Sequence, residues 1–326
     1  MTPPETNTIA LIPDREQRLA IIIPCYNEAL TVAQVVQDYS KAAPKADIIV
    51  FDNNSTDNTA EIATAAGAIV IHSPRQGKGN VLRHAFESVD ADVFILTDGD
   101  DTYPASALDT LLEPVLNEGV DMVVGTRLKE HKSDAFRRFH KLGNYVITSL
   151  VSLLFGQRIS DVLSGYRILS RRFAKDVYLR CGGFEVETEL TLQAISMGAT
   201  LREIPVPYGE RPPGSQSKLS TFKDGARIMR AILLIFKDYK PLVFFGALGA
   251  TAIILGLGFG LVPITDYVLF AYVYHLPLAV LAASLMILGT LLCGIGLILD
   301  TIKNLHFEER ARLRSLQNEI ERLRKK

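Results

Sequence analysis

Short apolar runs alternate with helical patterns along the first part of the chain. Each run is rich in Ile and Val and is bounded by Asp, Asn, Pro or Gly, as buried strands are. We predict strands at 19–24, 47–52, 67–72, 92–98 and 121–127, with helices between them at 29–42, 57–66, 78–89 and 105–117. This order predicts an α/β fold in which a mainly parallel, Rossmann-like sheet is covered on both faces. In such sheets ligands bind where the strands end.

Two later segments carry a different pattern. Residues 241–262 and 277–299 contain 22 and 23 residues without a charge. At about 1.5 Å per residue each reaches roughly 33 Å, which is enough to cross a bilayer. A buried hairpin in a soluble protein is the alternative. The connecting loop has no Lys or Arg, whereas Lys237 and Lys240 precede the first span. The basic tail follows the second span, so the positive-inside rule predicts both termini in the cytoplasm. We expect a protein with two spans in the cell (inner) membrane.

Amphipathic segments flank this membrane region. Residues 135–155 begin with basic side chains and end in an apolar stretch too short to span a bilayer, and 222–240 has an apolar face beside a basic one. We predict that both lie in the membrane interface, with ordinary core packing as the alternative. The basic tail, 300–326, is predicted to form an amphipathic helix on anionic lipid or in a self-association bundle. Residues 1–17 are predicted to be a mobile polar lead-in, and 18–221 a cytoplasmic catalytic domain.

Charge and cysteine content exclude several classes of protein. The chain has 35 Lys and Arg against 36 Asp and Glu, so there is no overall signal for nucleic-acid binding. Its three cysteines are widely separated, and none has C-x-x-C spacing. A disulfide framework or a thiolate metal site is therefore not predicted, and a reducing compartment fits best.

The acidic sequence TDGDD (97–101) closes one predicted strand. It places Asp98 and Asp100 on either side of a glycine. Carboxylates gathered at a strand end repel one another unless a cation is present, and Mg²⁺ or Mn²⁺ favours one or two carboxylates together with diphosphate oxygens. A solvated turn is the alternative. The position at a strand end in this kind of sheet favours a metal–diphosphate site.

Polar clusters also close two neighbouring strands. FDNNSTDNT places Asp52 where it could accept hydrogen bonds from a nucleotide base. An Asx-rich turn, with Ser55 or Thr56 as the cap of the next helix, is the alternative. PCYNE places Tyr26 and Glu28 near a base or ribose, with helix capping by the intervening Asn as the alternative.

GKGN (77–80) places Lys78 between two glycines at a predicted helix start. Glycines permit close backbone approach, and a helix N-terminus favours anions. The sequence is not a Walker A loop, because that motif has an earlier glycine five residues before the glycine that precedes the lysine, and this chain lacks it. We predict that Lys78 contributes to substrate binding.

Together PCYNE, FDNNSTD, RQGKGNVLRHAF (75–86) and TDGDDTYP (97–104) resemble the inverting family-two glycosyltransferases of GT-A fold. More narrowly, the chain resembles the polyprenyl-phosphate glycosyltransferases, the relatives of dolichol-phosphate mannosyltransferase and of bacterial undecaprenyl-phosphate glucosyltransferases. DVLSGYR (161–167) resembles their acceptor-side segment, FEVETELTLQA (184–194) its helical continuation, and ERPPGSQSKLS (210–220) their basic phosphate loop. Many relatives have paired acids where this chain has Asp52 and Asn53, and the Asp-Asn-Asn form resembles the glucosyl-transferring branch.

The resemblance implies inverting transfer of a sugar, first of all glucose from UDP-glucose, to a polyprenyl phosphate. Mg²⁺ or Mn²⁺ would be held by Asp98 and Asp100. Catalytic roles fall to Asp161, Asp100 and Arg127, where Asp161 orients the acceptor or takes a proton, or instead anchors Arg167. The implied substrate-binding residues are Pro24, Tyr26, Glu28, Asp52, Asn54, Lys78, Asp98, Arg167, Arg211 and Lys218. For Arg127, Arg211 and Lys218, which are candidates for phosphate contact, surface ion pairing is the alternative.

Two other functions compete with this one. A processive polysaccharide synthase generally needs more spans and a Q-x-x-R-W-type sequence, and this chain contains no Trp. A catalytically inactive GT-A scaffold in the membrane is the other alternative, although retention of the acids and Lys78 argues against it. The glycine-rich spans and the amphipathic tail predict a homo-oligomer. Predicted partners are a nucleotide-sugar, a polyprenyl phosphate and membrane lipid.

Overall fold

A computed structural model of the chain describes residues 17–127, 148–149, 151–209, 211–212 and 221–324. The chain divides into two compact units, Met1–Met229 and Arg230–Lys326. The predicted lead-in, most of the predicted interfacial segment 135–155 and most of the basic loop 210–220 lie outside the described residues. Those three interpretations therefore stay predictions.

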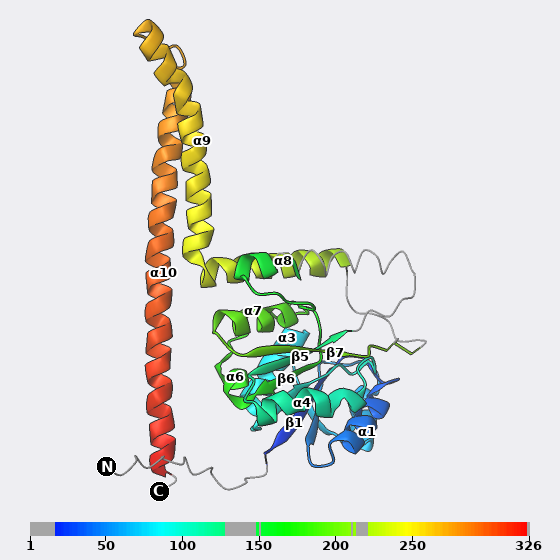
Figure 1. Cartoon of the computed structure of the whole chain (residues 1–326). Coiled ribbons are helices and arrows are strands. Elements are labelled where there is room, and N and C mark those ends of the chain that lie inside the picture. The colour runs from blue at the N-terminus through cyan, green and yellow to red at the C-terminus, as the bar shows by residue number, and fades with distance from the viewer. Residues whose placement is uncertain (1–16, 128–147, 150, 210, 213–220, 325–326) are drawn as a thin grey trace, which may run out of the picture. The chain divides into compact units, whose positions relative to one another are not determined.

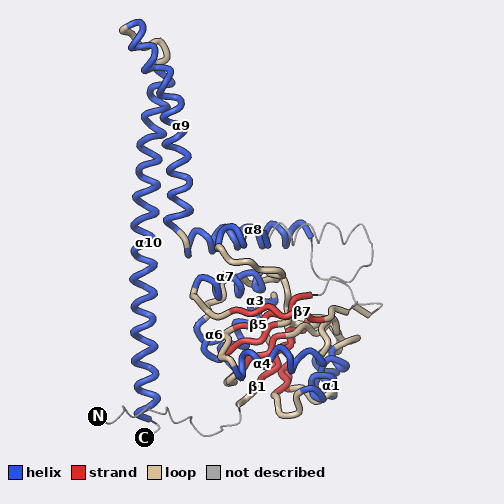
Figure 2. The backbone as a smooth tube through the Cα atoms, in the orientation of Figure 1, coloured by secondary structure: helices blue, strands red, loops and turns tan. Residues whose placement is uncertain are grey.

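The first unit is built on a seven-stranded sheet with the order β3-β2-β1-β4-β6-β5-β7 (Figures 1 and 2). The strands are β1 (Leu19–Cys25), β2 (Asp47–Asp52), β3 (Ile69–His72), β4 (Val93–Leu96), β5 (Met122–Arg127), β6 (Arg167–Ser170) and β7 (Leu201–Val206). Strand β6 is antiparallel to both of its neighbours, and the other pairs are parallel. The predicted mainly parallel sheet is thus confirmed.

Helices cover both faces of this sheet, because successive strand residues point to opposite sides. On one face Ile21 and Ile23 pack with α1 (Val32–Ala42), α2 (Thr59–Ala65) and α4 (Leu108–Asn117). On the other face Ala20 and Ile22 pack with α3 (Lys78–Ser88), α6 (Arg171–Asp176) and α7 (Val186–Ser196). A short 3₁₀ helix, η1 (Ala105–Ala107), precedes α4. The two apolar layers fix the strand ends that carry the candidate site.

Two strands and one short helix lie beyond what the apolar pattern predicts. β6 begins with a charged residue, Arg167, and ends with Ser170, so it lacks the continuous apolar run from which a buried strand is predicted. β7 contains Arg202, Glu203 and Pro205, and it lies at the edge of the sheet, where proline is tolerated. The polar helix α6 directly follows β6. These elements complete the sheet beyond the five predicted strands.

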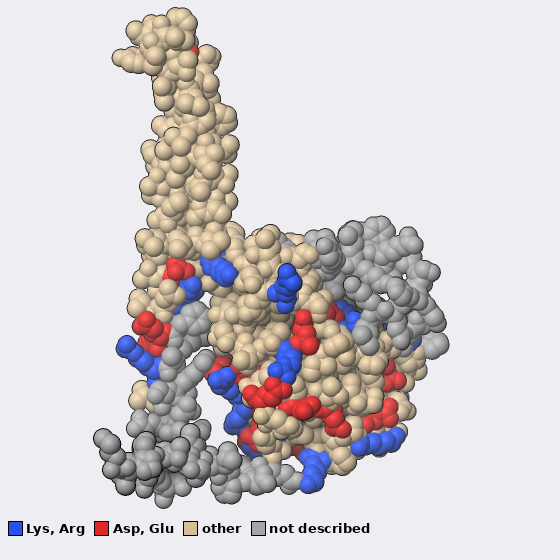
Figure 3. Space-filling view, viewed as in Figure 1, with Lys and Arg blue, Asp and Glu red and all other residues tan. Residues whose placement is uncertain are grey.

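The C-terminal part of the chain is helical. It comprises α8 (Thr221–Tyr239), α9 (Pro241–Phe270) and α10 (Leu276–Arg324) (Figure 1). Among the described residues, two helical segments are long and apolar enough to cross a membrane, Pro241–Phe270 and Leu276–His306, with mean hydropathies of 2.2 and 2.4. Only 11% of the most apolar window of each is buried, which disfavours a core helix of a soluble protein. Figure 3 shows a nearly uncharged surface along α9 and the part of α10 beside it.

The boundaries of the C-terminal helices and of the compact units differ from the predicted ones at two places. The amphipathic tail is not a separate helix, because α10 runs without a break from the second span to Arg324. The division of the chain between its two compact units also falls inside α8, after Met229. The predicted functions of these segments at a membrane surface stay predictions.

Candidate active site

The candidate site lies at the edge of the sheet where the parallel strands β1, β2 and β4 end. Cys25 pairs with Asp52 across β1 and β2, and Ile22 pairs with Leu96 across β1 and β4. The polar segments that follow these strands therefore begin at the same edge. Lys78, the first residue of α3, reaches this edge and contacts Asp98.

Two polar turns lock together beside β1 and β2. The Asn27 amide nitrogen donates to Ser55 Oγ at 3.0 Å, and the Thr56 amide donates to Asn27 Oδ1 at 2.7 Å. The N-cap residues of α1 and α2 are Thr31 and Asn58. The capping roles considered for Asn27, Ser55 and Thr56 are therefore wrong, because these side chains join the two turns instead.

The side chains predicted to hold the nucleoside are carried by these turns. Pro24 ends the apolar run of β1, and Tyr26 is 37% exposed. The Glu28 amide donates to a threonine hydroxyl of the second turn at 2.9 Å. Asp52 is buried, and its Oδ2 lies 3.6 Å from His72 Nδ1. The tertiary structure thus brings the four residues to one edge, and their contacts with a nucleoside stay a prediction.

Asn53 uses its side-chain amide to hold the segment that leads to α3. Its buried Nδ2 donates to the carbonyl oxygens of Ser73 at 2.9 Å and Arg75 at 2.8 Å. Its Oδ1 accepts a hydrogen bond from the Gly77 amide at 2.7 Å. A carboxylate could not donate to the two carbonyls. Asn54, at φ 63°, donates in the same direction, to the Pro74 carbonyl at 3.0 Å.

Asp98 and Asp100 are each held by a cation of the chain. Asp98 contacts the ammonium of Lys78. Asp100 is buried, accepts from Thr102 Oγ1 at 2.6 Å, and lies 2.5 Å from an Arg211 guanidinium nitrogen. The repulsion expected between neighbouring carboxylates is therefore relieved in this structure by Lys78 and Arg211.

Lys78 is shared between two acids. Its Nζ contacts Asp98 and lies 2.6 Å from Oε1 of Glu187, in the first turn of α7. Burial alone would lower the pKa of Lys78, but the charges of Asp98 and Glu187 outweigh burial and raise it. Burial raises the pKa of Glu187, against the opposing effect of Lys78. Lys78 therefore stays protonated and joins α3, α7 and the end of β4.

The glycines beside Lys78 allow the chain itself to pack against the start of α3. The Gly79 amide donates to the Gly182 carbonyl at 3.0 Å. A Cβ atom on Gly77 or Gly79 would lie 2.2 Å or 2.1 Å from the backbone oxygens of Gly182 and Cys181. The amide of Cys181 in turn donates to Glu189 Oε2 at 2.8 Å. The close backbone approach predicted from these glycines is therefore made by the protein's own chain.

Asp161 forms a two-pronged ion pair with Arg127 at the end of β5. Arg127 Nε and Nη2 donate to its two carboxylate oxygens, each at 2.7 Å. Burial would raise the pKa of Asp161, but the hydrogen bonds and charge of Arg127 outweigh burial and lower it. The structure thus brings these two predicted residues together. A carboxylate with a lowered pKa is a weak proton acceptor, which favours an orienting role over that of a base.

Arg167 does not face the site. It is 0% exposed, and its guanidinium donates to the carbonyls of Ser164 at 2.8 Å and Val162 at 2.9 Å, and to Thr191 Oγ1 at 2.8 Å. The predicted substrate contact of Arg167 is therefore corrected, because no surface of the side chain is open to a ligand, while Asp161 acts on Arg167 through its charge. Its donors hold the 162–164 turn against α7.

Arg211 faces the acid cluster, whereas Lys218 lies outside the described residues. Arg211 contacts Asp100, so it is near the predicted position of a diphosphate. The donor chemistry of Asp98 and Asp100 fits a hard divalent cation, since both supply carboxylate oxygens. Within the described ranges no group of three or more His, Cys, Asp or Glu could hold an ion alone. Oxygens of a bound diphosphate would have to complete the coordination.

Two residues that the motifs did not single out lie in the same cluster. Glu187 contacts Lys78, and Gly165 lies so close that a Cβ on it would be 2.6 Å from Asp98 Oδ2. The sequence carries no local signal for Glu187, because acids commonly stand beside the apolar stripe of a helix, and its burial at 5% exposure appears only in the fold. For Gly165, only tertiary packing shows that a side chain larger than hydrogen would clash with Asp98.

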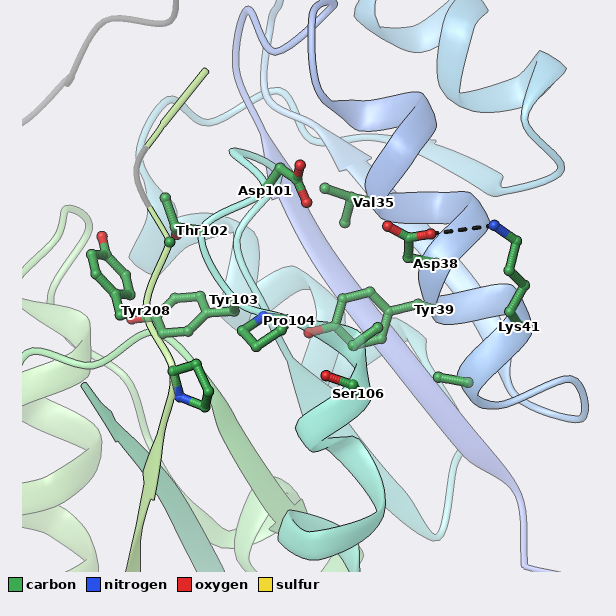
Figure 4. A pocket seen from close by; sticks show the side chains of 14 residues that line it. Val35, Asp38, Tyr39, Lys41, Asp101, Thr102, Tyr103, Pro104, Ser106 and Tyr208 are labelled. Atoms are coloured by element: carbon green, nitrogen blue, oxygen red, sulfur yellow. Dashed lines mark hydrogen bonds and ion pairs between the residues drawn. The ribbon is translucent and has the colours of Figure 1, made fainter. Parts of the chain in front are cut away.

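A hollow of about 650 Å³ lies beside α1 and the segment after β4 (Figure 4). Asp38 and Lys41 pair at 3.4 Å on its α1 wall, and Asp101 lines it from the other segment. Burial, followed by the charges of Asp38 and Asp100, raises the pKa of Asp101. The three acids of TDGDD are thus divided: Asp98 and Asp100 face cations of the chain, and Asp101 lines the hollow.

Comparison with known proteins places this arrangement in a family. A profile described as glycosyl transferase family 2 matches residues 20–178. The chain is 34% identical over 300 residues to Glycosyltransferase AglJ of Haloferax volcanii, which covers 92% of this chain and 98% of the relative. It is 31% identical over 218 residues to the Dolichyl-phosphate hexose transferase of the same organism, covering 67% of this chain and 93% of the relative.

A solved structure supports the fold. Glucosyl-3-phosphoglycerate synthase of Mycobacterium tuberculosis, crystallised with Mn²⁺ and uridine-diphosphate-glucose, superimposes with a TM-score of 0.58 at 21% identity. The match covers 68% of this chain and 79% of the synthase. The predicted GT-A fold, followed by two long apolar helices, is thereby confirmed.

Proposed function

Because this chain belongs to glycosyl transferase family 2, we propose that it transfers a sugar from a nucleotide-diphosphate donor to a polyprenyl phosphate. Glucose from a UDP-linked donor is the sugar we propose first. The observation that carries the proposal is the pair of acids after β4, partly buried Asp98 and buried Asp100, each beside a cation of the chain, in a chain that also has two membrane-length helices. The dolichyl-phosphate hexose transferase among its relatives supports the lipid acceptor.

Asp98 and Asp100 would hold a divalent cation, Mg²⁺ or Mn²⁺. When bound, such an ion neutralises charge that develops on the departing diphosphate. Lys78 and Arg211 already lie against the same carboxylates, so their positive charges are placed to attract the donor's phosphates. The Mn²⁺ in the structurally similar synthase supports this use of the acids.

The two locked turns would bind the nucleoside. Asp52 and Glu28 offer acceptors for base or ribose, and Tyr26, together with Pro24, offers apolar surface. Asn54 holds the second turn to the segment that leads to Lys78, so we assign it a positioning role in donor binding. The base and the sugar are the parts of this proposal that the donor panel below decides.

Asp161 would orient the acceptor side through Arg127 rather than act as a base. A phosphate monoester is mostly ionised near neutral pH, since its second pKa is about 6. The acceptor therefore needs little proton removal, unlike a sugar hydroxyl. Arg127, held by both oxygens of Asp161, is suited to contact a phosphate, and Lys218 is proposed for the same task.

The apolar helices would keep the catalytic unit at a membrane, where a lipid phosphate resides. We propose that the protein resides in the cell (inner) membrane. We also propose that its termini and its catalytic unit lie on the cytoplasmic side, because Lys237 and Lys240 precede the first span. We also propose interfacial positions for 135–155 and 222–240, and self-association of the chain. In-line displacement at the anomeric carbon would invert its configuration.

Sugar transfer into lipid tests the function directly. Purified full-length protein is incubated with undecaprenyl phosphate, Mn²⁺ or Mg²⁺, and each of a panel of radiolabelled nucleotide-sugars, and the organic extract is counted. We expect label from one donor, abolished by EDTA. Asp100→Ala should lower the rate roughly 100-fold or more.

A matched acid outside the cluster provides the control. Asp109, exposed on α4, should tolerate Asp109→Ala with an unchanged rate. If no donor labels the lipid although the protein is folded and binds nucleotide, the polyprenyl-phosphate acceptor is wrong. Label in water-soluble polymer would instead indicate a polysaccharide synthase.

A further inference from the structure

Glu187 offers Lys78 a second carboxylate in addition to Asp98. Its Oε1 lies 2.6 Å from Lys78 Nζ, and its side chain is only 7% exposed. Its other oxygen, Oε2, is buried and has no hydrogen-bond partner among the described residues. A buried acceptor without a donor is costly, so such an atom calls for an explanation.

Lys78 competes with a metal ion for Asp98. Its ammonium contacts Asp98 Oδ1, one of the oxygens that the proposed function assigns to the cation. Two positive charges cannot share one carboxylate without repulsion. An ammonium has three N–H donors, so Lys78 can give up Asp98 without loss only if another acceptor lies within reach.

The surroundings allow the ammonium to move while the backbone stays fixed. The Gly79 amide at the start of α3 donates a hydrogen bond to the Gly182 carbonyl, and the neighbouring Cys181 amide donates to Glu189 of α7. These hydrogen bonds join the helices that carry Lys78 and Glu187. Gly165 keeps the space beside the ammonium open, since a Cβ there would lie 3.0 Å from Lys78 Nζ. The positive charge of buried Arg167 also acts on Glu187.

We propose that Glu187 is a positioning residue that takes over Lys78 when a divalent cation binds Asp98. The ammonium turns from Asp98 Oδ1 to the unpartnered Oε2 of Glu187, so each buried charge keeps an opposite charge beside it. Glu187 thereby makes Asp98 available to the metal. This inference rests on the proposed function only in taking Asp98 as a metal ligand.

Metal binding, measured apart from sugar transfer, tests the proposal. Mn²⁺ is titrated into the full-length protein with UDP or GDP present, and unbound Mn²⁺ is followed by electron paramagnetic resonance. Glu187→Gln keeps the side chain's size but removes its charge, so Lys78 stays on Asp98. We expect the Mn²⁺ dissociation constant to rise roughly 10-fold, as for other residues that orient metal ligands.

Glu185→Gln is the matched control. It removes the same charge two residues away, where the carboxylate contacts the Gly183 amide rather than Lys78. Its Mn²⁺ affinity should stay within about twofold of wild type. In a Lys78→Met background Glu187→Gln should no longer weaken Mn²⁺ binding, because the competitor is gone.

Several outcomes would overturn the proposal. They are wild-type affinity in Glu187→Gln, equal weakening with and without Lys78, and failure of the wild-type protein to bind Mn²⁺ at all. If Glu187→Gln does not fold, Glu187→Asp keeps the charge on a shorter arm and must still weaken Mn²⁺ binding. Normal Mn²⁺ results without transfer to lipid would remove the proposed function and leave this inference standing.

Discussion

The side chain of Asn53 uses all of its polar atoms to hold the segment between β3 and α3. Two N–H groups meet the carbonyls of Ser73 and Arg75, and its oxygen meets the Gly77 amide. That segment leads directly to Lys78. These three hydrogen bonds give the amide a structural role at this position.

Asn53→Asp is expected to destabilise the protein although the two side chains have nearly the same size and shape. The buried Ser73 carbonyl and the part-buried Arg75 carbonyl would lose their donors and face a carboxylate, which costs about 2 kcal/mol or more. The thermal midpoint of the purified full-length protein should fall by about 5 °C. Asn54→Asp, whose hydrogen bonds are more exposed, should lower it less. An unchanged midpoint for Asn53→Asp would contradict the role given to this amide.

At the scale of secondary-structure elements, glycines allow the backbones of α9 and α10 to approach each other closely. A Cβ on Gly249 would lie 2.6 Å from Cys293 Sγ and 2.6 Å from the Gly289 carbonyl oxygen. Gly289 has a matching contact with Gly249, so the two backbones approach each other directly. Gly246, one turn earlier on α9, has nothing within 4 Å. The glycine-rich spans therefore serve contact inside the hairpin at some positions and face outward at others.

Gly249→Ala and Gly246→Ala form a matched pair on one helix. The first inserts a methyl group where none fits, and overpacking of this kind typically costs 1–3 kcal/mol. The second only adds helix propensity, worth up to about 1 kcal/mol. Thermal unfolding of the full chain in detergent should show a lower midpoint for Gly249→Ala and an equal or slightly higher one for Gly246→Ala. Equal midpoints for the two variants would show that the helices do not meet at Gly249.

For the whole molecule, the orientation of the spans decides where the chemistry occurs. The segment 271–275 between α9 and α10 has no Lys or Arg, while residues 301–326 carry eight basic side chains. Basic segments remain on the cytoplasmic side during insertion. If both apolar helices cross the membrane, the chain before the first span and the chain after the second lie on the same side, so we expect the proposed site and the C-terminus to share the cytoplasmic side.

Labelling of introduced cysteines on intact cells tests this orientation. The three native cysteines are first replaced by serine or alanine, and Tyr272→Cys or Gln317→Cys is then added. A membrane-impermeant maleimide should label Tyr272→Cys from outside, and Gln317→Cys only after the cells are opened. The reverse pattern would place the catalytic unit outside and exclude a cytoplasmic nucleotide-sugar as donor.

The sequence by itself determined the alternating strands and helices, the membrane-length helices and the family. These features depend on local periodicity or on motifs with fixed spacing, which a chain carries in its linear order. It also placed Asp98 and Asp100 at the end of a strand, where ligands bind in such sheets, whereas the contact of Lys78 with Asp98 came only from the fold. Elements with mixed polarity, such as β6 and β7, lacked this periodic signal.

Only the tertiary structure decided which charges meet. Asp161 forms its two-pronged ion pair with Arg127, whereas Arg167 is fully buried and donates to backbone carbonyls. Lys78 is shared with Glu187, a residue far along the chain. Such contacts depend on how the elements cross and on how deeply each charge is buried. Neither quantity is encoded in the spacing of neighbouring residues, so burial and distance had to come from the fold.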